Sequence, residues 1–197
     1  LFIQIKHFIH VFHTLKREYF FIIQERIIKH KMFAVRVCFF VEKHENPNVM
    51  EGKMIPISER KRIVVKVGTS TLTHRTGRLN IRRVEQLVKT LADLQNAGHE
   101  VILVSSGAIG LGMGKLGLMD RPKDTPGKQA CAAVGQCELM YLYDNLFSEY
   151  SITVAQLLLT KYILLEDRRK NVENALERLI SQGVIPVVNE NDTVAID

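Results

Sequence analysis

The apolar and polar residues of the chain follow two alternating periods from residue 62 onward. Residues 62–67 form a short β-branched run, and 100–105 form a continuously apolar run typical of strands buried on both faces. Between them, apolar residues recur with helical spacing over 81–98, and Gly98 stands where a helix would end. These patterns predict a strand, a helix and a second strand, which runs into the glycine-rich stretch 106–117.

The same alternation continues along the rest of the chain. The patterns predict a helix over 128–150, a strand over 152–160, a helix over 166–183 that ends at Gly183, and a strand over 184–192. Strands that alternate with helices of this length indicate βαβ crossovers and a mostly parallel sheet with helices on both faces. The predicted fold class is therefore α/β.

The residues at the ends of the predicted strands are rich in glycine, hydroxyl and carboxamide side chains. The strand ends carry "KVGTST" (66–71), "SSGAIG" (105–110), "LLLT" (157–160) and "NENDT" (189–193). In open parallel sheets, ligands bind outside the carboxyl ends of the strands. The sequence therefore places glycine, hydroxyl and carboxamide groups together at the edge where a ligand is expected.

Lys66 is a charged residue at the end of a buried strand, and a buried charge is paired or used. It precedes the loop Gly68-Thr69-Ser70, and a second loop, Ser105-Ser106-Gly107, opens a predicted helix. Backbone N–H groups in such loops and at helix N-termini bind oxyanions. A lysine between two of these loops suits polyphosphate binding and the stabilisation of charge in phosphoryl transfer.

The polar residues of the last strand end suit an amino-acid or metal ligand. Asp192 could take an ammonium group or a magnesium ion, and Asn189 and Asn191 could orient a carboxylate. Each motif has a plain structural alternative: a snorkelling Lys66, a helix cap at 105–107 and an ordinary turn at 189–192. Their joint occurrence at one predicted edge favours the functional interpretation.

Other motifs are set aside on context. Gly112, Gly114 and Gly117 match G-x-G-x-x-G, but they begin several residues after the strand, where a dinucleotide fingerprint does not belong. Leu116 stands where a P-loop needs Ser or Thr. Cys131 and Cys137 are expected to be small buried hydrophobic residues. An odd count of three cysteines with no C-x-x-C pair fits a reducing compartment and a cytoplasmic protein.

The composition changes near residue 53. Residues 1–53 hold eight of the nine Phe, five of the seven His and one of the 12 Gly. They also hold 9 Lys and Arg against 5 Asp and Glu, whereas residues 54–197 hold 18 against 16. The body of the chain is nearly neutral and has no nucleic-acid motif, so no nucleic-acid partner is expected.

Two interpretations of residues 1–53 stay open. Apolar residues from Leu1 to Ile22 recur at helical spacing, which is typical of a helix that lies on a membrane or a partner. No apolar run is long enough to span a membrane. The alternative is translated sequence upstream of a true start at Met50 or Met54, motivated by the Leu start and the change of composition.

Five blocks in order resemble the glutamate 5-kinases of the amino acid kinase family, from about Arg60 to Asp197. They are "VVKVGTSTLT" (64–73), "LVSSGAIGLG" (103–112), "KQACAAVGQ" (128–136), "AQLLLT" (155–160) and "PVVNENDTV" (186–194). The resemblance implies a three-layer αβα sandwich with a mostly parallel sheet. It also implies transfer of the γ-phosphoryl group of ATP, with Mg²⁺, to the side-chain carboxylate of L-glutamate, early in proline biosynthesis.

The resemblance implies a role for each motif residue. Lys66 is the catalytic, phosphate-binding lysine, next to the ATP-binding residues Gly68, Thr69 and Ser70. The substrate-binding residues that it implies are Ser106, Gly107, Asn189 and Asp192. No protein residue is expected to hold a metal ion.

The family's domain continues beyond Asp197, and its second half supplies the nucleotide's base and ribose contacts. Residues 54–197 are therefore expected to be the amino-acid-binding part of a truncated kinase domain, inactive alone and a homo-oligomer when full length. Two alternatives stay open: a related enzyme such as an acetylglutamate kinase, and a glutamate-binding regulatory or partner module without catalysis.

Overall fold

The computed structural model describes residues 22–24, 36–40, 60–74, 78–164 and 166–194. Of the segment 1–53 it describes only two short strands. The expected amphipathic helix near the N-terminus and the candidate start sites Met50 and Met54 therefore lie outside the described residues. Among the described helices, none combines the length and the apolar character needed to cross a membrane.

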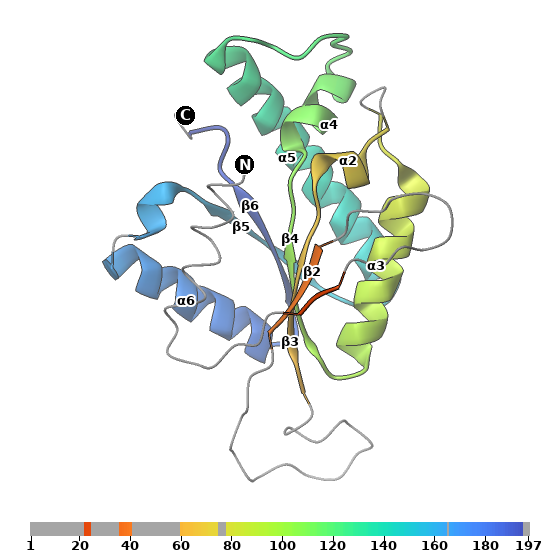
Figure 1. Ribbon diagram of the computed structural model, residues 1–197, viewed down its shortest axis with the longest axis vertical. Coiled ribbons are helices and arrows are strands. Elements are labelled where there is room, and N and C mark those ends of the chain that lie inside the picture. The colour runs from red at the N-terminus through yellow and green to blue at the C-terminus, as the bar shows by residue number, and fades with distance from the viewer. Residues whose placement is uncertain (1–21, 25–35, 41–59, 75–77, 165, 195–197) are drawn as a thin grey trace.

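The centre of the molecule is a six-stranded sheet with the order β1-β2-β3-β4-β6-β5 (Figure 1). The strands are β1 (Ile22–Gln24), β2 (Arg36–Phe40), β3 (Arg62–Lys66), β4 (Glu100–Val104), β5 (Val154–Leu159) and β6 (Ile185–Glu190). The strands β3, β4, β6 and β5 are parallel, whereas β1 and β2 add antiparallel pairs beside β3. The predicted, mostly parallel sheet is confirmed.

Helices cover both faces of this sheet. They are α2 (Thr69–Leu72), α3 (Ile81–Asn96), α4 (Ala108–Lys115), α5 (Thr125–Ser148), the 3₁₀ turn η2 (Lys161–Leu164) and α6 (Glu166–Ser181). The helices α3 and α5 pack on one face and α6 packs on the other (Figure 1). The three-layer αβα sandwich implied by the resemblance is confirmed.

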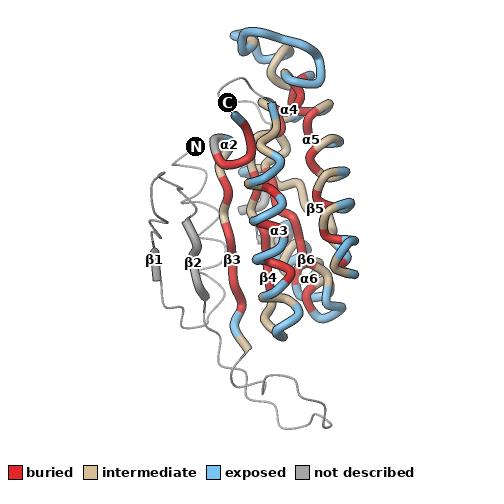
Figure 2. Tube along the Cα trace, turned by 90° about the vertical axis from the view of Figure 1, so that its right-hand side faces the viewer, coloured by how far each residue is buried: buried red, intermediate tan, exposed pale blue. Residues whose placement is uncertain are grey.

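The alternation of side chains along β3 divides the core between the two faces. Ile63 and Val65 belong to the larger core beneath α3 and α5, while Val64 belongs to the smaller core beneath α6. All three are buried, so the strand is apolar throughout, as its sequence suggested. Figure 2 shows the buried central strands and the exposed outer faces of the helices.

Three helices end at a glycine in the left-handed conformation. Gly98 follows α3 with φ +94°, Gly117 follows α4 with φ +69°, and Gly183 follows α6 with φ +74°. In each case the glycine N–H and the next N–H bond back to carbonyls of the last turn. The ends predicted at Gly98 and Gly183 are confirmed.

The first turn of α5 begins at Thr125, three residues before the predicted start. The Asp124 carboxylate accepts a hydrogen bond from the Gly127 N–H at 2.8 Å, and Pro126 stands in the first turn. An aspartate cap followed by proline is a recognised helix start. Its apolar periodicity begins only later, which is why the pattern alone placed the start too late.

Glycines let α4 and α5 cross at backbone contact. A Cβ atom added at Gly112 would lie 1.8 Å from the Cys131 carbonyl oxygen, and one at Gly135 would lie 1.7 Å from the Ala108 carbonyl oxygen. No other residue fits at either position without moving a backbone. Gly112 and Gly114 lie inside α4 and not in the turn that follows a strand, where a dinucleotide fingerprint would stand.

The expectation for the cysteines is correct for only one of the two. Cys131 is buried on α5, but Cys137 is exposed on the same helix. The two residues are six positions apart, which places them on different faces of a helix with 3.6 residues per turn.

An ion-pair network lies at the end of the sheet where the strands β3 and β4 begin. Arg62 is 5% exposed, and its guanidinium bonds to Glu100 at 2.8 Å and to both oxygens of Glu177 at 2.6 and 3.0 Å. Burial alone would lower the pKa of Arg62, but the hydrogen bonds and charges of Glu177 and Glu100 outweigh it, so the pKa is raised. The network fastens β3 and β4 to α6.

Candidate active site

The four parallel strands end together at the opposite edge of the sheet, at the top of Figure 1. Backbone hydrogen bonds continue the pairing into the loops: Val67 N–H to Val104 O at 2.9 Å, Ser105 N–H to Val188 O at 2.8 Å, and Asn191 N–H to Leu159 O at 2.8 Å. The predicted gathering of the four strand ends at one edge is confirmed.

Lys66 is the last residue of β3 and is half-buried. It lies on the α6 side of the strand, because Val64, two residues earlier, belongs to the core beneath α6. Gly68 caps the short helix α2, and the space where its Cβ would stand is open to 4 Å. The predicted loop 68–70 is therefore the start of a helical turn, with Thr69 exposed beside Gly68.

The first turn of α2 was not predicted, because four residues carry too little periodicity to show a helix. Two bonds close it: the Thr71 N–H donates to Gly68 O at 2.9 Å, and the Thr73 hydroxyl donates to Thr69 O at 3.0 Å. The backbone at Gly68 is consequently held in place beside the end of β3.

Ser106 and Gly107 connect β4 to α4. The Ser106 hydroxyl donates to the Val67 carbonyl at 2.9 Å, which ties this loop to the end of β3. Gly107 has φ +104°, where only glycine is unstrained, and its Cα faces Thr69 and Leu72 of α2. The two glycine loops therefore touch one another.

Helix α5 holds the ends of β4 and β6 through buried polar side chains. The Asn189 amide nitrogen donates to Gln136 Oε1 at 2.7 Å, and Ser105 Oγ bonds to the Tyr143 hydroxyl at 3.0 Å. Burial raises the pKa of Tyr143, and the bond with Ser105 opposes that rise in part, so the phenol is neutral. Sequence reasoning missed both partners, although their seven-residue spacing puts them on one helix face.

Asp192 and Asn191 begin the turn that follows β6, and both are half-buried. The turn is closed by the Val194 N–H, which donates to Asn191 O at 3.1 Å. Burial raises the pKa of Asp192, and the positive charge of Arg121 acts in the opposite direction. A carboxylate in this environment gains from a cationic ligand.

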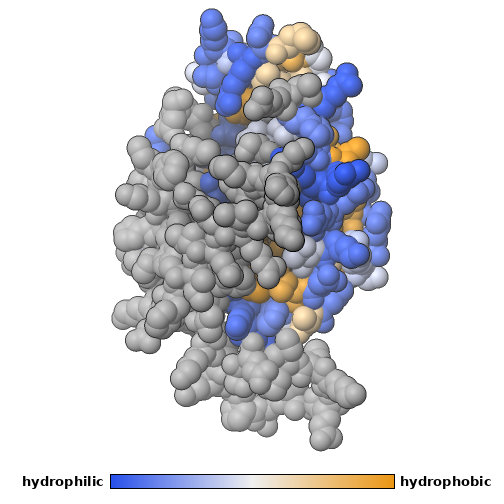
Figure 3. All heavy atoms as spheres, turned by 45° about the vertical axis from the view of Figure 1, so that its right-hand side comes forward, coloured by the Kyte–Doolittle hydropathy of each residue, from blue (hydrophilic) through white to orange (hydrophobic). Residues whose placement is uncertain are grey.

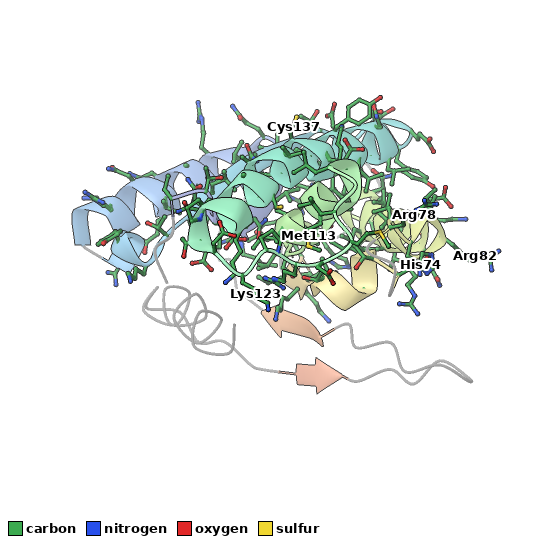
Figure 4. The ribbon with its side chains drawn as sticks, turned by 90° about the horizontal axis from the view of Figure 1, so that it is seen from above. His74, Arg78, Arg82, Met113, Lys123 and Cys137 are labelled. Carbon is green, nitrogen blue, oxygen red and sulfur yellow. The ribbon has the colours of Figure 1, made fainter. Side chains whose placement is uncertain are left out.

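Three exposed basic side chains and one histidine lie near the same edge of the molecule. In Figure 4, which looks down on it, His74, Arg78 and Arg82 lie together beside α2 and α3, and Lys123 lies in the loop before α5. All four are exposed. The positive charges of Arg78, Arg82 and Lys123 favour the approach of an anionic ligand.

The tip beyond α4 is apolar. Leu116 and Leu118 are exposed, and Met119 is 95% exposed. Figure 3 shows this apolar area at the upper end of the molecule.

The described part of the chain contains no group of three or more His, Cys, Asp and Glu residues that could hold a metal ion. The structure brings Lys66, Gly68, Thr69, Ser106, Gly107, Asn189 and Asp192 to one edge. Ser70 lies in α2 at the same edge. Their contacts with ligands remain predictions.

The α/β fold with its motif residues at the strand ends agrees with the family match: the chain belongs to the amino acid kinase family, whose model matches residues 61–197. The curated relatives that the chain resembles carry a more specific name than the family. The chain is 53% identical over 144 residues to the glutamate 5-kinase of Moorella thermoacetica, covering 73% of this chain and 38% of that protein. It is 54% identical over 142 residues to the glutamate 5-kinase of Clostridium perfringens, covering 72% of this chain and 53% of that protein.

A third relative is the glutamate 5-kinase of Symbiobacterium thermophilum, 56% identical over 135 residues, which are 68% of this chain and 52% of that protein. The chain therefore spans about half the length, or less, of the curated relatives it matches.

Proposed function

We propose that the chain forms the amino-acid-binding part of a glutamate 5-kinase. In the reaction, a side-chain carboxylate oxygen of L-glutamate attacks the γ-phosphorus of ATP, the bond to the β-phosphate bridging oxygen breaks, and ADP leaves. The product is L-glutamyl 5-phosphate, an early intermediate of proline biosynthesis. The observation that carries the proposal is the joint position of the Lys66, Ser106 and Asp192 loops at one edge of the sheet.

Lys66 and the start of α2 suit the phosphate groups of ATP. The lysine ammonium supplies a full positive charge, which stabilises the negative charge that develops on the transferred phosphoryl group. Open space at Gly68 allows a phosphate to approach the backbone closely. Kinases use ATP with Mg²⁺, and the ion is usually carried by substrate phosphates, water and few carboxylates.

Ser106, Gly107, Asn189 and Asp192 suit the amino acid. The Ser106 proton is committed to the Val67 carbonyl, so its lone pairs are left for a ligand donor. The Asp192 carboxylate can pair with the α-ammonium group of glutamate, which would supply the cation that this half-buried site favours. Both groups accept hydrogen bonds, so they recognise the same ammonium.

The experiment compares ligands that differ at this ammonium. Calorimetric titration of the chain with L-glutamate and N-acetyl-L-glutamate should show binding of L-glutamate alone, since an acetylated amine cannot pair with Asp192. Equal or preferential binding of N-acetyl-L-glutamate would contradict the proposal and favour an acetylglutamate kinase.

A second measurement separates catalysis from binding. Hydroxylamine traps acyl phosphates, so the full-length protein from its natural source should form a hydroxamate from L-glutamate only when MgATP is present, whereas residues 1–197 alone should form none. Glutamate binding without this product would favour a regulatory or partner module.

We place the protein in the cytoplasm and infer that its full-length form is a homo-oligomer, as the apolar tip at 116–119 permits.

A further inference from the structure

Two carboxamides meet in the interior at the end of β6. Asn189 is 5% exposed and Gln136, from the middle of α5, is 9% exposed. The Asn189 amide nitrogen donates to Gln136 Oε1 at 2.7 Å. Because one N–H of the Asn189 amide is used on α5, its oxygen Oδ1 is turned away from that contact and can accept a hydrogen bond from a ligand.

Gln136 is a costly residue for this position. Its own amide nitrogen Nε2 is buried and finds no hydrogen-bond partner among the described residues. Leaving a buried donor unpaired costs about 1–3 kcal/mol, whereas an apolar pair of similar shape would avoid the cost. A contribution to stability therefore explains the Asn189–Gln136 pair poorly, and a role in the ligand site explains it better.

The position of the pair relative to the site supports this interpretation. Asn189 stands three residues before Asp192, and its neighbour across the sheet is Leu158 of β5. Two turns along α5, Tyr143 bonds to Ser105, which precedes Ser106 at the end of β4. One helix face thus fixes the two strand ends that carry the candidate glutamate-binding residues.

We propose that Gln136 is a positioning residue of the amino-acid site, which turns the Asn189 carboxamide so that its oxygen is presented to the ligand's α-ammonium group. An asparagine held in this way presents an acceptor oxygen, which suits an ammonium group and repels a carboxylate at the same place. Gln136 therefore contributes to selectivity for an amino acid over a dicarboxylic acid. The inference rests on the proposed function.

The test compares L-glutamate with glutarate, which has both carboxylates and lacks the ammonium group. Gln136→Met keeps the length of the side chain but removes the acceptor, and Gln136→Glu keeps an acceptor oxygen. Calorimetry on the chain should show that Gln136→Met weakens L-glutamate binding about tenfold and leaves glutarate unchanged. Gln136→Glu should retain most of the discrimination.

Tyr143→Phe is the matched control, because it removes the other buried polar contact of the same helix face. It should lower the melting temperature and leave the ratio of the two dissociation constants unchanged. An unaltered ratio in Gln136→Met, or an equal loss of both ligands in Gln136→Met and Tyr143→Phe, would overturn the inference while glutamate binding by the wild type stands. Absence of glutamate binding by the wild type would overturn the proposed function, and the inference with it.

Discussion

Asp192 is a half-buried carboxylate at the end of β6. Burial raises its pKa, and the positive charge of Arg121 acts in the opposite direction. We expect Asp192→Asn to weaken L-glutamate binding by about 30-fold, since removing one partner of a desolvated charge pair costs about 2 kcal/mol or more. Calorimetric titration measures this loss, and a variant that binds glutamate as the wild type does would contradict the assigned role.

The same residue predicts a dependence of stability on pH. A pKa raised in the folded state means that the folded chain binds the proton more tightly than the unfolded chain. The contribution of Asp192 to stability is therefore present at acid pH and is lost as pH rises through its folded pKa. Asp192→Asn should accordingly melt above the wild type at pH 7, and the difference should vanish as the pH falls below the ordinary aspartate range. Thermal melting across pH measures it, and a variant less stable than the wild type at pH 7 would contradict the argument.

Gly107 is a position at which the backbone conformation requires glycine. At φ +104° an alanine is strained, and its Cβ would also stand 3.4 Å from the Thr69 Cα. We expect Gly107→Ala to destabilise the chain by about 1–3 kcal/mol, measured by urea unfolding. Gly68→Ala is the control, because Gly68 has an ordinary φ of −91° and open space around it. An equal loss in both variants would show that conformation is not the cause.

At the scale of the elements, the crossing of α4 and α5 depends on Gly112 and Gly135. An added methyl group at Gly135 meets backbone atoms, which cannot rotate away, so Gly135→Ala should cost about 1–3 kcal/mol or more. Gly114→Ala, at an exposed position of α4, should instead stabilise by about 0.5–1 kcal/mol through helix propensity. Urea unfolding distinguishes these opposite signs, and a loss of stability in Gly114→Ala would contradict the packing argument.

The sequence predicted the long elements well and the contacts between them poorly. Alternating periods place β3 to β6 and the helices α3, α5 and α6 within a few residues, because each long apolar face must be buried. Gly98 and Gly183 mark helix ends because the left-handed conformation selects glycine. The motif residues of the candidate site were found from their places at strand ends.

The features that the sequence did not predict have a common cause. Periodicity reports which face of an element is buried, and it does not report the neighbour on that face. The partners Gln136 of Asn189 and Tyr143 of Ser105 depend on that neighbour, as does the insertion of β6 between β4 and β5. The turn α2 was missed because it is shorter than the period that would reveal it.

At the scale of the molecule, Arg62 joins the layers at the edge remote from the site. Glu177→Ala would leave a buried guanidinium without its bidentate partner on α6, so we expect a loss of about 2 kcal/mol or more. Glutamate binding should not change, because the network lies at the other end of the strands. Melting and calorimetry measure the two quantities.

Glu173→Gln is the control for this variant. Glu173 pairs with Arg169 at 3.3 Å one turn along the same helix, and such pairs contribute about 0.3–0.5 kcal/mol. A loss in Glu177→Ala no larger than in Glu173→Gln would show that the Arg62 network does not hold the layers together.

The place of β6 in the sheet sets the order in which the protein can assemble on the ribosome. The strands β4 and β5 emerge first but are not neighbours, so a slot one strand wide stays open between them until residues 185–190 have been translated. Until then both strands carry unpaired backbone groups that invite pairing with other chains. When β6 emerges it fills the slot and brings Asn189 and Asp192 alongside Ser106, so β4 and β5 gain their shared neighbour in the same step that brings the candidate ligand-site residues together.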